Sequence, residues 1–445
     1  MKVSYSKNKR GITIKVNNST FGISYPPQIW KNFISEPNSR SWIDNITYAR
    51  TVGLGLNKDN TNLDFNFPVP VLKTFFDISM FYDIPRIMDE DKIELKHIMK
   101  NIFNSKMSFN GYDVELPKFE GTLKEDAIIA ASFGKDSLLS YGLAKEIGLN
   151  PKLVFVDDKY NDAESNLKRE IMKKFSKEVD DVFLIEDETD RFYDKKNLNK
   201  DDLSSCSTNA MNLYTMMLLP FNFFFKSKYI VLGNEQNLND YFIDKNGIIC
   251  YPSPDQTSDW IKQQEIFIRM LSSNKAKVVS LIEPLYNIAE MKILHNRYKN
   301  VGKYQMSCML EGIKISKSHW CGECAGCCKA FLFFKALNID PIKYSFTDDL
   351  FKKEYRIYYP LFSKKGARIY EKPPRVRDEQ LFSFYLAYKN KAEGYLINEF
   401  KRKFLREAKK REDELYKTFY SIHKSVTTPN KIKGRLMSIF KEELS

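Results

Sequence analysis

The apolar positions in the central part of the chain alternate between strand-like runs and helix-like spacings. Ala127 to Ala131 form an unbroken apolar run, which is typical of a strand buried on both faces of a parallel sheet. From Leu138 onward the apolar residues recur at mainly four-residue steps, which indicates a helix. The same alternation predicts further strands at 153–156, 182–185 and 229–232 and further helices at 163–175 and 209–225. The pattern therefore predicts an α/β fold built on an open parallel sheet.

Polar residues follow three of these predicted strands at their carboxyl ends. Ser132–Ser137 follow the first strand, Asp157–Asp158 the second and Gly233–Glu235 the fourth. Ligands of doubly wound sheets bind beyond the carboxyl ends of the strands, so we expect these segments to share one rim. The Asp157–Asp158 pair could instead cap the helix that follows it. On this rim and a polar loop about 20 residues further on, substrate contacts are predicted for Asn234, Glu235 and Gln256.

The two ends of the chain have different patterns from the centre. Apolar residues alternate with polar ones over 12–16 and again over 21–25, which predicts an antiparallel hairpin. Beyond residue 340 the chain is rich in aromatic and basic residues, with helical spacing at 378–388 and 399–415. We predict a smaller α+β N-terminal module for substrate recognition at 1–118, the sheet domain at 119–340 and a helical extension at 341–445.

Length and composition support a folded protein with more than one domain. The chain has 445 residues, of which 43% are hydrophobic, enough for packed cores. It contains no run of eighteen apolar residues, and the first residues lack the apolar centre of a signal peptide. We therefore expect a cytoplasmic protein with no membrane association.

The formal net charge of +13 suggests a polyanionic partner. The basic region after residue 340 is the predicted surface for such a partner, either RNA or another protein. A lysine-rich solvated surface explains the same charge without any partner, and it is the simpler interpretation of the charged helix at 399–415.

Five of the seven cysteines lie between residues 308 and 328, and this clustering favours a metal over disulfides. A Cys-x2-Cys turn brings two thiolates to one tetrahedral ion. The predicted ligands of a structural zinc ion are Cys308, Cys321, Cys324 and Cys327. Cys328 could replace Cys327, although the two-residue spacing favours Cys327. Four-cysteine ligation also suits an iron–sulfur cluster, which stays the alternative.

The segment Ser132-Phe-Gly-Lys-Asp-Ser137 resembles the S-G-G-x-D-S signature of the PP-loop ATP pyrophosphatases, with Phe133 in place of the first glycine. A glycine turn between a strand and a helix directs backbone N–H groups at an anion, most often phosphate. The resemblance implies cleavage of ATP to AMP and pyrophosphate, with Mg²⁺ near Asp136. It assigns ATP binding to Ser132, Phe133, Gly134, Lys135, Asp136 and Ser137, to which the rim adds Asp157. Among these residues, it assigns catalytic roles to Lys135, Asp136 and Ser137.

The loop together with the later Cys-x12-Cys-x2-Cys-x2-Cys pattern resembles 7-cyano-7-deazaguanine synthase over about residues 125–340. That family adenylates the carboxylate of 7-carboxy-7-deazaguanine and uses ammonia to form a nitrile. Longer relatives include the UDP-N-acetylmuramoyl-L-alanyl-L-glutamate epimerases and synthase-like proteins of antiviral defence systems, thought to attach a deazaguanine to a partner protein. The resemblance implies an enzyme that adenylates a small carboxylate, releases pyrophosphate and requires ATP, Mg²⁺ and Zn²⁺.

Two other hypotheses remain open at this point. The basic C-terminal region is compatible with a tRNA-modifying PP-loop enzyme. Phe133 in a glycine position is compatible with a catalytically silent ATP-binding partner of a defence complex. No residue in the sequence identifies itself as the base or nucleophile of a second step.

Overall fold

The computed structural model describes residues 1–37, 39–57, 60–111, 118–159, 161–194, 197, 207–307, 320–363 and 369–445. Its strands are β1 (Lys2–Lys7), β2 (Gly11–Val16), β3 (Ser19–Ser24), β4 (Asn62–Phe65), β5 (Lys106–Phe109), β6 (Lys124–Ala130), β7 (Lys152–Asp157), β8 (Val182–Asp187), β9 (Ser227–Leu232), β10 (Phe242–Ile243), β11 (Ile249–Cys250) and β12 (Lys277–Ser280). Its α-helices are α1 (Pro27–Ile34), α2 (Ser39–Thr51), α3 (Lys73–Asp91), α4 (Leu95–Asn104), α5 (Lys135–Glu146), α6 (Asp162–Glu178), α7 (Ala210–Phe225), α8 (Ser258–Leu271), α9 (Asn287–Arg297), α10 (Lys299–Gly302), α11 (Ala325–Ala336), α12 (Pro374–Lys389), α13 (Tyr395–Lys403), α14 (Leu405–Lys410), α15 (Glu412–Phe419) and α16 (Asn430–Leu444). A search of these described helices finds none with the length and apolar character needed to span a membrane.

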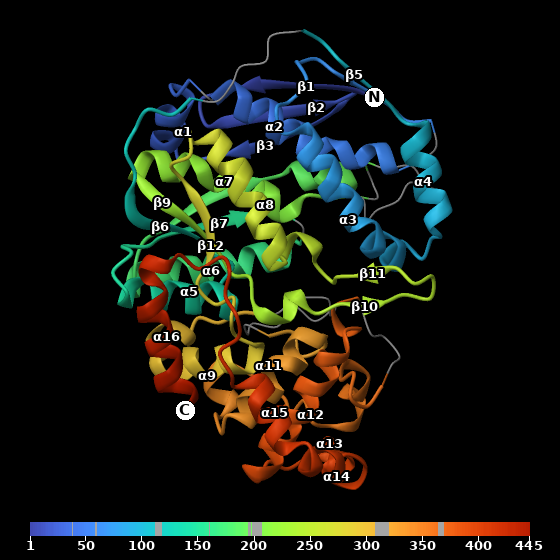
Figure 1. Ribbon diagram of the computed structural model, residues 1–445, viewed down its shortest axis with the longest axis vertical. Coiled ribbons are helices and arrows are strands. Elements are labelled where there is room, and N and C mark those ends of the chain that lie inside the picture. The colour runs from blue at the N-terminus through green and yellow to red at the C-terminus, as the bar shows by residue number, and fades with distance from the viewer. Residues whose placement is uncertain are drawn as a thin grey trace.

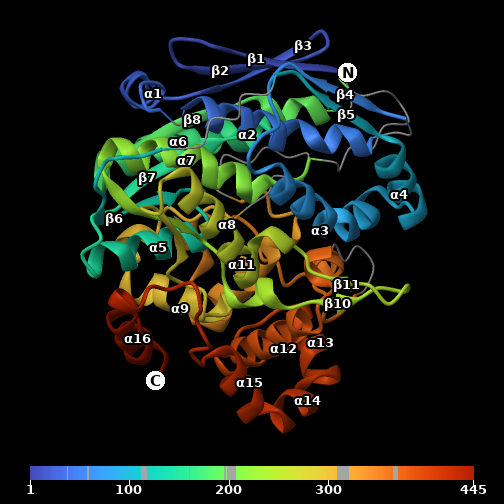
Figure 2. The ribbon, with the colours of Figure 1, turned by 45° about the horizontal axis from the view of Figure 1, so that its top comes forward.

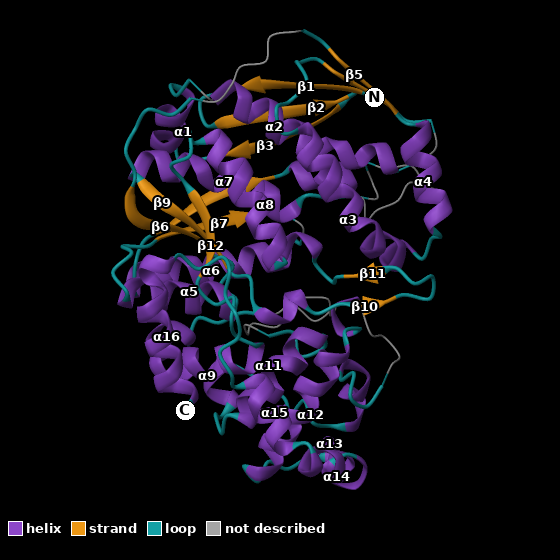
Figure 3. Ribbon diagram, viewed as in Figure 1, coloured by secondary structure: helices purple, strands orange, loops and turns teal. Residues whose placement is uncertain are grey.

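Ten of the described strands form one large sheet in the order β12-β9-β6-β7-β8-β3-β2-β1-β4-β5 (Figures 1 and 3). The strands from β12 to β8 are all parallel to their neighbours. Beyond β8, the hairpin of β2 and β3 joins the sheet with antiparallel pairing, and parallel pairing returns at β4 and β5. The predicted α/β class with a mostly parallel sheet is confirmed.

Alternate residues of the central strands face two separate cores. In β6, Ala127 and Ile129 pack in the core that contains α5, α9 and α11, whereas Ile128 packs in the core that contains α2, α7 and α8. Both faces of the strand are therefore covered, which is why its sequence reads as a continuous apolar run. Figure 2 shows α7 and α8 on one side of the strands and α5 and α9 on the other.

The N-terminal strands extend the central sheet. Ile23 and Ser24 of β3 pair with Asp187 and Glu186 of β8, and residues from β2 and β3 share a core with α7. The C-terminal helices α12 to α16 share the opposite core with α5, α9 and α11. The domain boundaries after residues 118 and 340 stay predictions, since two continuous cores cross them.

The structure also contains elements that the apolar pattern missed. Strands β4, β5 and β12 have only four residues each, too few for a clear alternation. The stretch 399–415 is helical as predicted, but it is divided among α13, α14 and α15 and does not form one continuous helix. The chain leaves helical geometry at Phe404, whose φ is −125°, and its ring packs against Phe362.

A buried ion pair stands where the N-terminal helices meet the sheet. Arg50 of α2 donates a hydrogen bond to Asp187, the last residue of β8, and a second one of 2.9 Å to Asp190. Asp187 is completely buried, and burial raises the pKa of its carboxyl group although Arg50 opposes that effect. Removing one partner of a buried pair leaves an uncompensated charge.

We therefore expect Arg50→Met to lower the free energy of unfolding by about 3–5 kcal/mol, measured by urea denaturation. The double variant Arg50→Met/Asp187→Asn should recover a part of that loss because it no longer buries a lone charge. The exposed Arg10, changed to Met, is the control and should shift the free energy by less than about 0.5 kcal/mol. Equal stability of Arg50→Met and Arg10→Met would contradict this role.

Candidate functional site

The loop between β6 and α5 lies at the rim where the parallel strands end. Register pairs β6 with β7 on one side and with β9 on the other, so Ser132 lies between the ends of these two neighbours. A side chain at Gly233, directly after β9, would come within 2.8 Å of the Cβ of Asp136. The close approach of these two segments explains why glycine stands at the end of β9.

The two serines of the loop form a small polar cradle. Ser132 N–H donates to Ser137 Oγ at 3.3 Å, and Gly134 N–H donates to Ser132 Oγ at 3.3 Å. The Ser137 hydroxyl in turn donates to the Gly134 carbonyl at 3.2 Å. Both hydroxyls therefore stand beside the N-terminus of α5, where the helix dipole favours an anion.

Phe133 has a left-handed backbone with φ of +58°, and its side chain is 1% exposed. Its ring packs against Phe155 and Phe175, and its carbonyl accepts a hydrogen bond of 2.7 Å from Met306 N–H. Left-handed geometry favours glycine, the residue that the resembled signature has here. Phe133 thus adopts the backbone of the glycine that it replaces, and its ring fills the core beneath the loop.

A cavity of about 330 Å³ opens at this rim, and we call it the loop cavity. Of the predicted site residues, the loop cavity is lined by Ser132, Asp136, Ser137, Asp157, Asn234 and Gln256. Asn234 donates a hydrogen bond of 2.7 Å to the Gln256 carbonyl, while its own side-chain oxygen is buried with no partner among the described residues. The structure therefore brings the three rim segments of the sequence together.

Asp157 contacts several groups of its own chain. It accepts hydrogen bonds from Ser165 at 2.8 Å and Arg169 at 2.6 Å, and Lys159 lies 3.0 Å away. Burial acts to raise the pKa of Asp157, but these hydrogen bonds lower it overall. The carboxylate is therefore charged and held in place at the wall of the loop cavity. Its neighbour Asp158 accepts a hydrogen bond of 2.7 Å from Tyr214.

Lys135 is buried among three carboxylates that come from three different parts of the chain. Its ammonium group contacts Asp136, Glu235 and, at 2.7 Å, Glu290 Oε2 of α9. We call these four residues the acidic group. Burial lowers the pKa of Lys135, but the three carboxylates outweigh burial and raise it well above the usual value. Burial and the charge of Glu235 raise the pKa of Glu290.

The acidic group has more negative than positive charge, and it is suited to a divalent cation. One oxygen from each of Asp136, Glu235 and Glu290 lies within 4.8 Å of the others. Carboxylate oxygens are the ligands that Mg²⁺ prefers, and such an ion would balance the excess charge. Glu290 was missed in the sequence because it lies inside a helix, 155 positions from Lys135. The sequence shows only a Glu within a helix that is rich in apolar residues, which does not reveal its partner.

A second cavity of about 240 Å³ adjoins the acidic group on the C-terminal side of the molecule, and we call it the knuckle cavity. Lys135, Asp136 and Glu235 contribute to its wall, so Asp136 is shared with the loop cavity. Its other walls come from α9, α11 and α12 and from loop and 3-10 segments, including Ser307 and Tyr370. The two cavities therefore meet at the first turn of α5.

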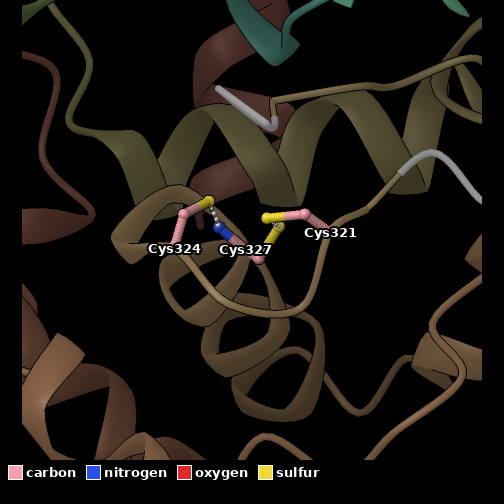
Figure 4. Close-up of side chains that lie close together, drawn as sticks. All are labelled: Cys321, Cys324 and Cys327. Atoms are coloured by element: carbon pink, nitrogen blue, oxygen red, sulfur yellow. Dashed lines mark hydrogen bonds between the residues drawn. The ribbon is translucent and has the colours of Figure 1, made fainter. Parts of the chain in front are cut away.

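Three of the predicted zinc ligands lie together at the start of α11 (Figure 4). We call Cys321, Cys324 and Cys327 the cysteine knuckle. The sulfur atoms of Cys321 and Cys327 are 3.8 Å apart, which is the separation expected for two thiolates bound tetrahedrally at about 2.3 Å from one zinc ion. Cys324 caps the helix by accepting a hydrogen bond from Cys327 N–H at 3.3 Å.

Two further cysteines of the cluster differ in position. Cys308, the predicted fourth ligand, lies outside the described residues. Cys328 is buried and outside the knuckle, and it interacts with the hydroxyl group of Tyr359. The knuckle thus has the donor atoms and the spacing that a structural zinc ion requires, with sulfur as the only donor type among the described ligands.

Comparisons with known proteins add no assignment to this geometry. No protein-family model matches the chain, and no curated protein matches it at the significance threshold applied. The chemistry of the site therefore follows from its own residues.

The backbone of Phe133 leads to a prediction about stability. Phe133→Ala and Phe133→Gly both remove the buried ring and should each cost about 3–5 kcal/mol of unfolding free energy. The glycine variant should be more stable than the alanine variant by about 1 kcal/mol, because only glycine adopts φ of +58° without strain. The same pair at Phe155, in the middle of β7, is the control and should show the opposite order by urea denaturation. Greater stability of Phe133→Ala would contradict the strain.

The cysteine knuckle leads to a second prediction. We expect the purified chain to contain zinc and Cys324→Ser to lose it, measured by elemental analysis, because the variant lacks one thiolate ligand. Cys328→Ser is the matched control from the same helix and should keep its zinc. Retained zinc in Cys324→Ser, or its loss in Cys328→Ser alone, would exclude the proposed ligand set.

Proposed function

We propose that this protein is a PP-loop enzyme that adenylates a small carboxylate with ATP and releases pyrophosphate. One observation carries the proposal: the Ser132–Ser137 loop and the start of α5 open on the loop cavity directly beside the acidic group. Hydroxyl groups and helix N–H groups suit phosphate oxygens, and the neighbouring carboxylates suit the cation that accompanies ATP. The resemblance to the PP-loop signature supports the same reaction.

The roles of the individual residues follow from their positions. Ser132 and Ser137 hold phosphate oxygens as hydrogen-bond donors, together with the first N–H groups of α5. Asp136, Glu235 and Glu290 would hold Mg²⁺, which supplies neutralisation of the charge on the phosphates. In the reaction, a carboxylate oxygen of the substrate attacks the α-phosphorus of ATP. The bond between that phosphorus and the bridging oxygen breaks, and the electron pair leaves with pyrophosphate.

Lys135 has a role that its position in the acidic group defines. Its ammonium group is surrounded by the three carboxylates and lines the knuckle cavity instead of the loop cavity. We propose that Lys135 keeps these carboxylates together before ATP and its metal ion bind. With a cation held by the carboxylates, the ammonium group of Lys135 would be free to donate a hydrogen bond to a phosphate or to the acyl oxygen.

The structure of the loop favours an active enzyme over a silent ATP-binding partner. Phe133 preserves the left-handed turn, and its ring is buried in the core. Phe133 is not among the described residues that line the loop cavity. The substitution therefore leaves the cradle of Ser132 and Ser137 in place. The substrate class, a deazaguanine-type carboxylate or that of a longer relative, is proposed from the sequence resemblance.

The proposal is tested by incubating the chain with ATP, Mg²⁺ and a pool of small carboxylates and measuring pyrophosphate. We expect release that depends on a carboxylate, and Asp136→Asn should reduce it at least about 100-fold because the variant loses one of the three carboxylates that would hold Mg²⁺. Asp126→Asn, at the opposite end of the β6 unit, is the matched control and should retain full activity. Stimulation by tRNA alone would identify the tRNA-modifying alternative instead. ATP binding without pyrophosphate from any pool would reject the adenylation reaction.

A further inference from the structure

The knuckle cavity is built by the beginnings of four helices. Lys135 and Asp136 open α5, Asn287 opens α9, Ala325 and Gly326 open α11, and Val376 lies in the first turn of α12; all six line the cavity. The N-terminus of a helix carries partial positive charge and N–H groups without helical partners. Two of these helix ends offer fewer free N–H groups to a ligand. At the start of α9, Ile288 N–H donates to Glu379 at 3.0 Å, and α12 begins with a proline, which has no N–H.

Lys329 is the lysine of this cavity that is free to bind an anionic ligand. It lies one turn after Ala325 on α11, and it has no ion-pair partner within 4.0 Å among the described residues. Lys135, the other lysine of the cavity, is engaged by the acidic group. Glu235 and Glu379 line the same cavity as Lys329.

Carboxyl groups line the same cavity, and three of them have partners within the chain. Asp136 and Glu235 contact Lys135. Glu379 is 3% exposed, accepts hydrogen bonds from Ile288 N–H and from the Asn287 amide at 3.1 Å, and burial raises its pKa to about 7. Glu371 is only partly buried. An anion held at Lys329 therefore meets carboxyl groups of which Asp136, Glu235 and Glu379 already have partners in the chain.

Asn287 provides the second polar feature. Its side chain is 1% exposed, and its amide group donates to Glu379, but its Oδ1 has no hydrogen-bond partner among the described residues. A buried acceptor without a partner is costly, and such an atom beside a cavity indicates a donor that comes with a ligand. The expected ligand therefore carries at least one N–H or O–H group.

The remaining lining limits the size and nature of the ligand. Met291, Ala330, Phe333 and Val376 provide apolar walls for an organic body. The volume of about 240 Å³ is slightly below the roughly 300–1,000 Å³ of sites for drug-sized ligands, so the ligand is a small molecule.

We propose that the knuckle cavity binds the carboxylic acid that is adenylated, and that this acid also carries an N–H donor. Lys329 holds the carboxylate, Asn287 Oδ1 accepts the N–H group, and the shared wall at Asp136 is where the acid meets the nucleotide. This inference rests on the proposed function. It gives the cysteine knuckle and α12 a role in the site, since α11 and α12 position Lys329 and Glu379.

The test uses 3-aminobenzoate and 3-methylbenzoate, two acids of the same shape in which an amino group replaces a methyl group. Binding to the full chain is measured by ligand-observed NMR titration without ATP. We expect 3-aminobenzoate to bind several-fold more tightly than 3-methylbenzoate, although the methyl group is the more apolar one. We expect Lys329→Met to weaken the binding of both acids roughly tenfold, because the charge-assisted hydrogen bond is lost.

Lys335→Met is the matched control, since Lys335 lies on the same helix over the ring of Phe331 and does not line the described part of the cavity. It should bind both acids as the unchanged chain does, and zinc content together with circular dichroism establishes that both variants are folded. Equal binding to Lys329→Met and the unchanged chain would overturn the site. Absence of binding by both acids, or equal affinity for the two, would overturn the proposed ligand class.

The experiments distinguish a failure of the acid site from a failure of the proposed adenylation. Acid binding that requires Lys329, together with no pyrophosphate release, rejects adenylation and retains the site. Pyrophosphate release with a KM for the acid that Lys329→Met leaves unchanged retains adenylation and rejects the site.

Discussion

The contact of Lys135 with three carboxylates, of which Glu235 and Glu290 are buried, is the interaction on which the arrangement of the site depends. Asp136 follows it in the chain, Glu235 comes from the end of β9 and Glu290 comes from α9. Each carboxylate alone would be costly to bury, and the lysine makes their proximity tolerable. The contact therefore fixes α5, the rim of the sheet and α9 relative to one another. Both cavities take their shared wall from this point.

The two cores explain how distant parts of the chain contribute to one site. The core on the α5 face continues into the C-terminal helices, so α11 and α12 are packed beside the acidic group. The core on the α7 face continues into the N-terminal strands and into α2. The loop itself contributes few atoms to either core, apart from Phe133. Its geometry is set by elements that are packed on both faces of the sheet.

Much of the rim was predictable because it depends on local patterns. The apolar runs at 153–156 and 229–232 correspond to β7 and β9, and the polar residues that follow them line the loop cavity. Glu290 was not predictable in its role, since it acts through a contact with Lys135, which lies 155 positions away. The place of Lys329 in the knuckle cavity was also hidden, since segments far apart in the sequence line that cavity. The backbone of Phe133 was equally hidden, because a sequence motif shows which residue differs but not which φ it adopts.

The antiparallel pairing of β3 with β8 affects how much sheet edge is open to strands of other molecules. β8 ends the run of parallel strands, and without β3 its N–H and C=O groups would form an open edge. Open edges recruit strands from other molecules. β3 covers the end of this edge, at Glu186 and Asp187, and the sheet continues from there to β5, a strand of four residues. Short edge strands are a common protection against pairing between molecules. The N-terminal region therefore limits the exposed edge of the sheet in addition to packing against its core.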